Sequence, residues 1–134
     1  MIAKVGMQLP DAELIVVDDA SRDDTASIAE RCGATVIRQA YNKGNGAAVK
    51  AGIRAARGEV ILLLDADGQH DPADLPRILA PIGPYDLVVA ARSRASNATW
   101  TRGFGNAMLN RFATYLTGVE VRDLTSGFRA MKRE

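Results

Sequence analysis

The sequence is poor in cysteine and has almost no net charge. Its single cysteine, Cys32, excludes an intrachain disulfide and favours a reducing, cytoplasmic setting, and we expect its thiol to pack in the core. Lys and Arg total 17 against 16 Asp and Glu, which leaves a net charge of +1. A chain this close to neutral gives no indication of a nucleic-acid partner, because such partners select a strongly basic surface.

Long hydrophobic runs are also missing. No stretch of about 18 apolar residues occurs, so the sequence encodes no transmembrane helix. The opening MIAKVGMQLP lacks the long apolar segment of a secretory signal. Repeats, low-complexity segments and linkers are absent as well. What is present is a chain of 134 residues, 47% of them hydrophobic, which is enough to bury the core of one domain.

Short apolar runs alternate with segments of helical pattern. The runs predict strands buried on both faces, in ELIVVDD (13–19), ATVIRQ (34–39), EVILLLD (59–65) and DLVVAAR (86–92). Helices are predicted at 23–33, 47–58, 72–82 and 100–116, and a short strand in the tail 121–134. Ser21 is the expected cap of the first helix, and Gly33, Gly58 and Gly118 are the expected ends of three helices. This order predicts an α/β fold, with a mostly parallel sheet flanked by helices.

Charged residues follow these strands at the edge where such sheets bind ligands. Asp18 and Asp19 end the first strand, Asp65 and Asp67 follow the third, and Arg92 follows the fourth. Because the carboxyl ends of parallel strands meet at one edge, we expect these five side chains to lie on one rim.

The closely spaced pair Asp65 and Asp67 is the strongest chemical signal. Two carboxylates held this close repel each other unless a cation or a proton lies between them. Mg²⁺ and Mn²⁺ prefer carboxylate oxygens, and Mg²⁺ completes its shell with water and substrate phosphates. The pair therefore predicts a divalent metal and a phosphorylated ligand. The alternative is that the aspartates only cap the turn, which is the role we expect for Asp71 before Pro72.

Other candidate residues have weaker signals. The loop from Asn42 to Gly46 contains Lys43 and two glycines, so its amides could bind phosphate, although an ordinary helix entry fits equally well. His70 is either a neighbour of the metal pair or a loop histidine. Several arginines could bind phosphate oxygens or form a solvated face; they are Arg92, Arg94, Arg102 and Arg129.

Four motifs in order resemble a known family. VVDDASRDDT, NKGNGAAVKAG, LLLDADGQHDP and DLTSGFRA are similar to segments of the inverting family-2 nucleotide-sugar glycosyltransferases. Within that family, DADGQHDP and TSGFR most resemble the dolichyl- and polyprenyl-phosphate sugar synthases, the dolichol-phosphate mannosyltransferase group. The resemblance runs from about Ala12 to Lys132. It implies a GT-A, Rossmann-like fold, with residues 1–134 as one partial catalytic domain.

The resemblance also implies roles for individual residues. Asp65 and Asp67, assisted by Gln69, would hold Mg²⁺ or Mn²⁺ against the donor diphosphate. Donor-binding residues would be Asp18, Asp19, Lys43 and Asp65. Asp67 and Arg92 would act in catalysis, and the acceptor or its phosphate would meet Arg102, Thr125, Ser126 and Arg129.

The implied reaction is transfer of a sugar, with inversion, from GDP-mannose or a UDP-sugar to a polyprenyl or dolichyl phosphate. A lipid phosphate is already an anion at neutral pH, so this acceptor needs no general base. A sugar hydroxyl would need one, and Asp123 is the candidate. A lipid acceptor implies peripheral association with the cytoplasmic face of a membrane. The sequence leaves homo-oligomerisation open.

Two departures from the family pattern leave other readings open. No Pro-x-Tyr-Asn-Glu-like strand precedes Glu13, where MIAKVGMQLPDAE resembles the end of a helix, and the chain stops soon after TSGFR. The chain therefore resembles a fragment cut at both ends, which makes a non-catalytic fragment the main alternative. A phosphatase with Asp65 as nucleophile is a second, although Gln69 stands where its threonine is expected. A phospho-receiver domain is a third, but DLVVAARS lacks its lysine.

Overall fold

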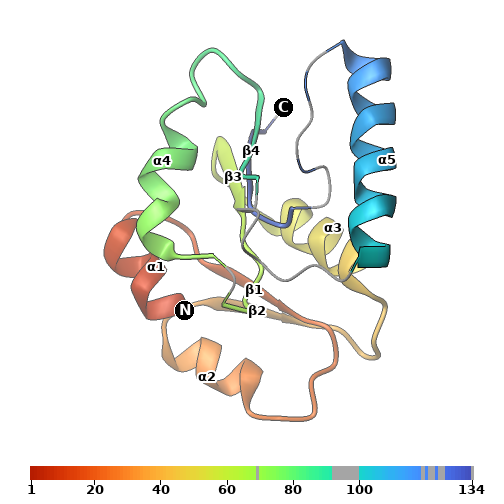
Figure 1. Ribbon diagram of the computed structural model, residues 1–134. Coiled ribbons are helices and arrows are strands. Elements are labelled where there is room, and N and C mark those ends of the chain that lie inside the picture. The colour runs from red at the N-terminus through yellow and green to blue at the C-terminus, as the bar shows by residue number, and fades with distance from the viewer. Residues whose placement is uncertain (69, 92–99, 119, 121–122, 124–125, 134) are drawn as a thin grey trace.

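The computed structural model describes residues 1–68, 70–91, 100–118, 120, 123 and 126–133, with only the backbone of 100–107 and 117. The elements follow one another along the chain as helices and strands in near alternation (Figure 1). They are α1 (Ile2–Gln8), β1 (Ile15–Asp18), α2 (Thr25–Arg31), β2 (Thr35–Arg38), α3 (Asn45–Ala55), β3 (Val60–Leu63), the 3₁₀ turn η1 (Pro72–Asp74), α4 (Leu75–Leu79), β4 (Leu87–Val89), α5 (Trp100–Thr117) and β5 (Arg129–Lys132).

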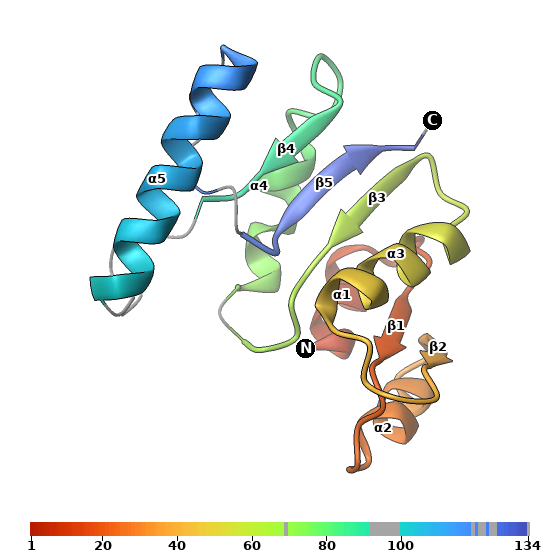
Figure 2. The ribbon, with the colours of Figure 1, turned by 90° about the vertical axis from the view of Figure 1, so that its right-hand side faces the viewer.

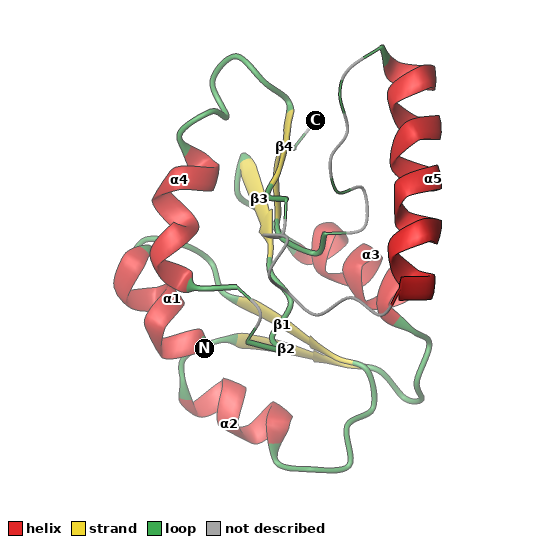
Figure 3. Ribbon diagram, viewed as in Figure 1, coloured by secondary structure: helices red, strands yellow, loops and turns green. Residues whose placement is uncertain are grey.

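The strands form two sheets. β1 and β2 pair in parallel, with Ile15 opposite Thr35 and Asp18 opposite Arg38. β5 lies between β3 and β4 and pairs antiparallel with both, as Figure 2 shows. The predicted α/β architecture is confirmed, and its parallel pairing is found in β1 and β2. Helices line both sides of this layered arrangement (Figure 3).

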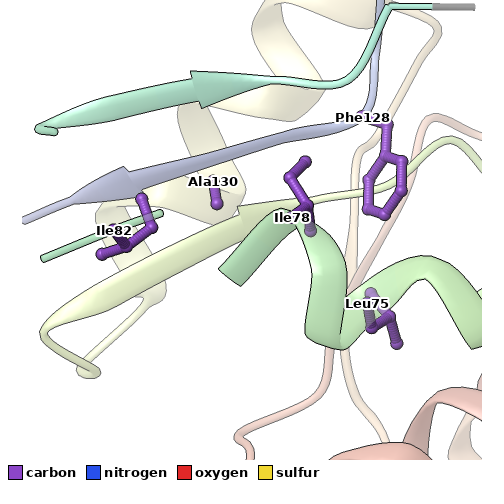
Figure 4. Packing of buried hydrophobic residues seen from close by; sticks show 5 residues of the cluster. All are labelled: Leu75, Ile78, Ile82, Phe128 and Ala130. Carbon is purple, nitrogen blue, oxygen red and sulfur yellow. The ribbon is translucent and has the colours of Figure 1, made fainter. Parts of the chain in front are cut away.

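The main core lies between α4 and the three-stranded sheet. Its buried members, shown in Figure 4, are Leu75, Ile78, Ile82, Phe128 and Ala130. Leu75 and Ala130 are fully buried, and burying a side chain such as leucine or phenylalanine contributes about 1.5–3 kcal/mol. Phe128 and Ala130 belong to the C-terminal segment, so this segment is part of the core that supports β3.

Helix boundaries follow local capping more closely than the sequence pattern suggested. Helix α2 begins at Thr25, after Asp24 as its N-cap residue, and the Asp23 carboxylate accepts the Thr25 amide at 3.1 Å in the turn that precedes it. Ser21 was predicted to cap this helix, which is wrong: its amide instead donates to Asp18. Helix α3 begins two residues before its predicted start and ends at Ala55, ahead of Gly58.

Other local predictions have mixed outcomes. Gly33 follows the C-cap residue of α2 and Gly118 follows α5, and they adopt positive φ angles of 84° and 68°, as predicted for helix ends. The expectation of a helix near the N-terminus is confirmed by α1. The expectation that Cys32 packs in the core is wrong, because its side chain is exposed at the end of α2.

Candidate functional site

The first two sequence motifs meet at the end of β1. Asp19 accepts hydrogen bonds from the backbone amides of Lys43 at 2.7 Å and Gly44 at 2.8 Å. Gly44 has a φ of 85°, in the left-handed region that favours glycine, and it precedes α3. Both Asp19 oxygens therefore fix the entry of α3, so the two motifs form one structural unit.

Asp18 is buried beside Asp19 but has a different partner. Its Oδ1 accepts the Ser21 amide at 2.9 Å, across a turn in which Ala20 has a φ of 63°. Hydrogen bonds from Ser21, with a smaller contribution from Arg38, hold the pKa of Asp18 below its usual range. Asp18 thus remains charged at neutral pH and closes the turn after β1.

A basic cavity lies between β2 and α3, with a volume of about 390 Å³. Its lining includes Ile37, Gln39 and alanines of α3. The cationic side chains around it come from Arg38, Lys43, Lys50 and Arg54. The Lys43 ammonium also lies 5.1 Å from the centre of the Tyr41 ring, which holds it near the cavity.

The third and fourth motifs meet at the end of β3. The Asp65 carboxylate is half-buried and lies directly against Gly127, where a Cβ atom would overlap it. His70 stacks at 5.0 Å against Phe128, with the rings inclined by 46°. The segment from Asp65 to His70 is therefore joined to the C-terminal turn at two points, and His70 is a packed loop residue.

Asp67 and Asp71 lie further along the same loop. Asp67 is exposed, and Gly68 after it takes a φ of 80°, which turns the chain. Asp71 accepts the Ala73 amide at 3.0 Å with Pro72 in the first turn of η1, so its predicted capping role is confirmed. Because Asp71 caps η1, the candidate metal ligands among the aspartates of this loop are Asp65 and Asp67.

Two of the predicted acceptor residues, Ser126 and Arg129, lie where the chain enters β5. Ser126 is fully buried, and its Oγ accepts the Phe128 amide at 3.3 Å. Arg129 Nε donates to the Ser126 carbonyl at 2.6 Å, which holds the guanidinium against the turn. In this structure both side chains stabilise the turn that contacts Asp65.

Four predicted site residues cannot be placed. Gln69, Arg92 and Thr125 lie outside the described residues, as does the side chain of Arg102. The two motif pairs also belong to different sheets, since β1 and β3 do not pair with each other. The four aspartates therefore follow strands of two different sheets, and the single rim expected for Asp18, Asp19, Asp65 and Asp67 stays a prediction.

The donor set at Asp65 and Asp67 suits a hard divalent ion. Within the described residues, no group of three or more His, Cys, Asp or Glu side chains could hold a metal. A site with two carboxylates leaves coordination positions for water and phosphate oxygens, which is the usual arrangement for Mg²⁺. The pair fits a metal that is shared with a phosphorylated ligand.

Two residues that hold β1 and the loop after β3 in place, Gly127 and Glu13, were not predicted from the sequence. Gly127 contacts Asp65, and only its position in TSGFR could have drawn attention to it. Glu13 accepts three hydrogen bonds from Arg57, including one from its backbone amide at 2.9 Å, and these bonds lower the pKa of Glu13. This pair joins the start of β1 to the segment after α3.

Comparison with known proteins identifies the family. The model of the family described as "Glycosyl transferase family 2" matches residues 1–134. The chain belongs to glycosyl transferase family 2. Membership in this family agrees with the resemblance of the four sequence motifs.

Relatives in this family include enzymes named for lipid-phosphate acceptors. The chain is 35% identical over 128 residues to the undecaprenyl-phosphate 4-deoxy-4-formamido-L-arabinose transferase of Pseudomonas savastanoi, covering 90% of this chain and 38% of that protein. It is 34% identical to the glycosyltransferase AglJ of Haloferax volcanii, covering 92% and 42%. The chain thus spans about half or less of the length of the curated relatives it matches.

Solved structures confirm the fold. Mannosyl-3-phosphoglycerate synthase from Rubrobacter xylanophilus superposes with a TM-score of 0.77 at 23% identity, over 98% of this chain and 47% of that one. Glucosyl-3-phosphoglycerate synthase from Mycobacterium tuberculosis, in complex with Mn²⁺, UDP-glucose and phosphoglyceric acid, gives a TM-score of 0.70 at 24% identity, over 98% and 51%. The GT-A fold predicted from the motifs is therefore confirmed.

Proposed function

We propose that this chain is part of a metal-dependent, inverting glycosyltransferase that moves a sugar from GDP-mannose or a UDP-sugar to a polyprenyl or dolichyl phosphate. The observation that carries the proposal is the carboxylate pair after β3, of which Asp65 lies against the turn that leads from Ser126 to Arg129. Metal-binding and acceptor-binding groups would then meet at one strand end. The lipid-phosphate acceptor named for the Pseudomonas relative supports the acceptor class.

Asp65 and Asp67 would hold the metal, with Gln69 as a further ligand. Bound there, Mg²⁺ or Mn²⁺ would offset the negative charge that develops on the departing nucleoside diphosphate. Asp19 fixes the Lys43 loop, so the Lys43 side chain would meet the donor as a cation. Asp18, Arg92 and Arg102 complete the proposed donor and phosphate contacts.

The acceptor would approach from the side of the C-terminal turn. Ser126 belongs to this turn, and Arg129 at the start of β5 is oriented there by its bond to the Ser126 carbonyl. Thr125 is the third residue proposed for the acceptor contact. A lipid phosphate attacks as an anion, so no residue is required to remove its proton. Displacement from the face opposite the leaving group inverts the anomeric carbon.

The exposed face of α5 supports a membrane-bound acceptor. Large apolar side chains are solvent-exposed along one stripe, namely Met108, Leu109, Phe112, Tyr115 and Leu116. At 100° per residue they span an arc of about 120°, with exposed Arg111 beside it, which is the pattern of a helix that lies in a bilayer interface. Within the described chain no helix is long and apolar enough to cross a bilayer. We propose peripheral association through this stripe, at the cytoplasmic face.

A transfer assay tests the proposed reaction. The chain is incubated with Mn²⁺ and radiolabelled GDP-mannose, UDP-glucose or UDP-GlcNAc, and with undecaprenyl or dolichyl phosphate. Label should enter the lipid phase from one donor, and Asp67→Asn should abolish transfer while Asp71→Asn, which keeps the capping oxygen, should not. Donor binding without transfer would favour the non-catalytic alternative, and hydrolysis of a generic phosphomonoester would favour the phosphatase.

A further inference from the structure

Gly127 lies so close to the Asp65 carboxylate that no larger residue fits without a rearrangement. A Cβ atom at Gly127 would overlap Cγ and both oxygens of Asp65. At every other glycine whose surroundings are described, the nearest atom to such a Cβ is at least 3.4 Å away. A glycine hydrogen occupies this direction, so the contact is between the Gly127 Cα–H and the carboxylate.

We propose that Gly127 is a positioning residue that sets the orientation of the Asp65 carboxylate. The proposal rests on the proposed function, in which Asp65 and Asp67 hold a divalent metal against the donor diphosphate. The glycine is not explained by its backbone conformation, because Gly127 does not adopt a positive φ. Glycine is needed here because it has no side chain, which leaves room for the Asp65 carboxylate.

The backbone at Gly127 is held from both sides. Ser126 and Phe128 are 0% and 2% exposed, and Phe128 packs with Leu75 in the core that Figure 4 shows. The Phe128 carbonyl accepts the Ala90 amide at 3.0 Å, and β5 begins at the next residue between β3 and β4. Displacing this turn would disturb the core and two strand pairings.

The Asp65 side chain is therefore the part that must move. Its carboxylate can turn about two side-chain bonds, whereas the buried turn would have to leave its packing. A methyl group at position 127 should thus push the carboxylate to another rotamer, away from the orientation in which it would share a metal with Asp67. Metal sites tolerate displacements of only about 0.5 Å, and loss of such a supporting contact typically weakens metal binding about 10- to 100-fold.

Mn²⁺ titration of the full chain tests this effect. Free Mn²⁺ is followed by electron paramagnetic resonance in the presence of UDP and, separately, GDP, with Gly127→Ala, Asp65→Ala and the parent compared. Gly83→Ala is the matched control, because a Cβ at Gly83 meets no atom within 4 Å. Gly127→Ala should raise the Mn²⁺ dissociation constant at least 10-fold, and Gly83→Ala should leave it unchanged.

A double mutant separates positioning from general destabilisation. Asp65→Ala removes the three overlapping atoms, so adding Gly127→Ala should weaken Mn²⁺ binding no further and should restore any loss of thermal stability caused by Gly127→Ala alone. If the double mutant remains as unstable as Gly127→Ala, the effect does not act through Asp65 and the proposal is overturned.

A metal-free readout makes the two possible failures distinguishable. The ¹³C resonance of the Asp65 carboxyl, assigned by its loss in Asp65→Ala, should shift in Gly127→Ala and stay in place in Gly83→Ala. An unshifted resonance, or parent-like Mn²⁺ affinity in Gly127→Ala, overturns the positioning role. Failure of the parent to bind Mn²⁺ with either nucleotide would instead overturn the proposed function, even where the Asp65 resonance moves.

Discussion

Asp19 and Gly44 are 25 positions apart, and the carboxylate of one accepts the backbone amide of the other at 2.8 Å. The second Asp19 oxygen accepts the Lys43 amide at 2.7 Å. Two neighbouring N–H groups at the entry of α3 are thus satisfied by one side chain at the end of β1. These two hydrogen bonds fix the backbone at Lys43 and therefore the point from which its side chain, the proposed donor-binding cation, extends.

Removing the Asp19 carboxylate should loosen the entry of α3. Asp19→Ala removes the acceptor of the Lys43 amide and leaves the Gly44 amide with only its longer bond to Asn42 Oδ1, at 3.2 Å. Hydrogen bonds to a charged, partly exposed group of this kind contribute about 1–2 kcal/mol in total. Asp19→Asn keeps one acceptor oxygen and should lose less. Urea unfolding measures the difference, with Asp11→Ala as a control at an exposed carboxylate. Equal unfolding free energies for Asp19→Ala and the control would contradict a stabilising role for the Asp19 hydrogen bonds.

Asp18 should make stability depend on acid pH. Its folded-state pKa is lowered by the Ser21 hydrogen bonds, so it lies below the unfolded value of about 3.9. The unfolded chain therefore binds this proton first as the pH falls. The stabilisation is fully present above about pH 5 and is lost below that, as the pH falls through the folded pKa. Unfolding free energies from pH 6 to 2.5 should fall less steeply for Asp18→Asn, and identical slopes would contradict the assignment.

Leu75 should be the most sensitive position of the core. It is 0% exposed and packs beside Phe128, so truncation removes buried methyl groups and leaves a cavity. Leu75→Ala should cost about 2–5 kcal/mol in unfolding free energy. Leu87, which is 54% exposed on β4, is the control, and Leu87→Ala should cost far less. Calorimetry or urea unfolding measures both variants, and similar losses of unfolding free energy would contradict the central position of Leu75 in the core.

The apolar stripe of α5 should bind lipid surfaces. Vesicles that contain anionic phosphatidylglycerol should cosediment with the parent chain, and Phe112→Asp should weaken binding about 10-fold or more, because it places a charge in the apolar face. Met7→Asp changes an apolar residue that is 75% exposed on α1 and should have little effect. Equal losses in both variants would indicate nonspecific adhesion, and concentration-dependent dimerisation without vesicle binding would indicate a second copy as the partner.

Features set by neighbouring residues could be predicted from the sequence. The strands with terminal aspartates, the helix ends at Gly33 and Gly118, and the Asp71 cap all depend on short-range geometry. Capping failed as a guide at Ser21, because its amide could satisfy Asp18 in a turn as readily as its side chain could begin a helix. Both options obey the same local rules, and the structure has the turn, with a φ of 63° at Ala20 and the helix beginning only at Thr25.

Long-range pairing could not be predicted from the sequence pattern. The tail was expected to form a strand, but its position between β3 and β4 depends on the burial of Phe128 and Ala130 against α4. The contact between Asp65 and Gly127 follows from that insertion. The proposed role of Asp65 comes from the motif resemblance, whereas its contact with Gly127 is known only from the tertiary structure.

The central claim is that Asp65 and Asp67 hold a metal against the donor diphosphate. It is tested most directly by thermal unfolding of the chain with GDP-mannose, UDP-glucose or UDP-GlcNAc, each in Mn²⁺ or in EDTA. At 100 times the dissociation constant a donor stabilises by about 2.7 kcal/mol, which raises the midpoint by several degrees. The account predicts this shift for one donor, in Mn²⁺ only, and its loss in Asp67→Asn. An equal shift in EDTA, or an undiminished shift in Asp67→Asn, would contradict it.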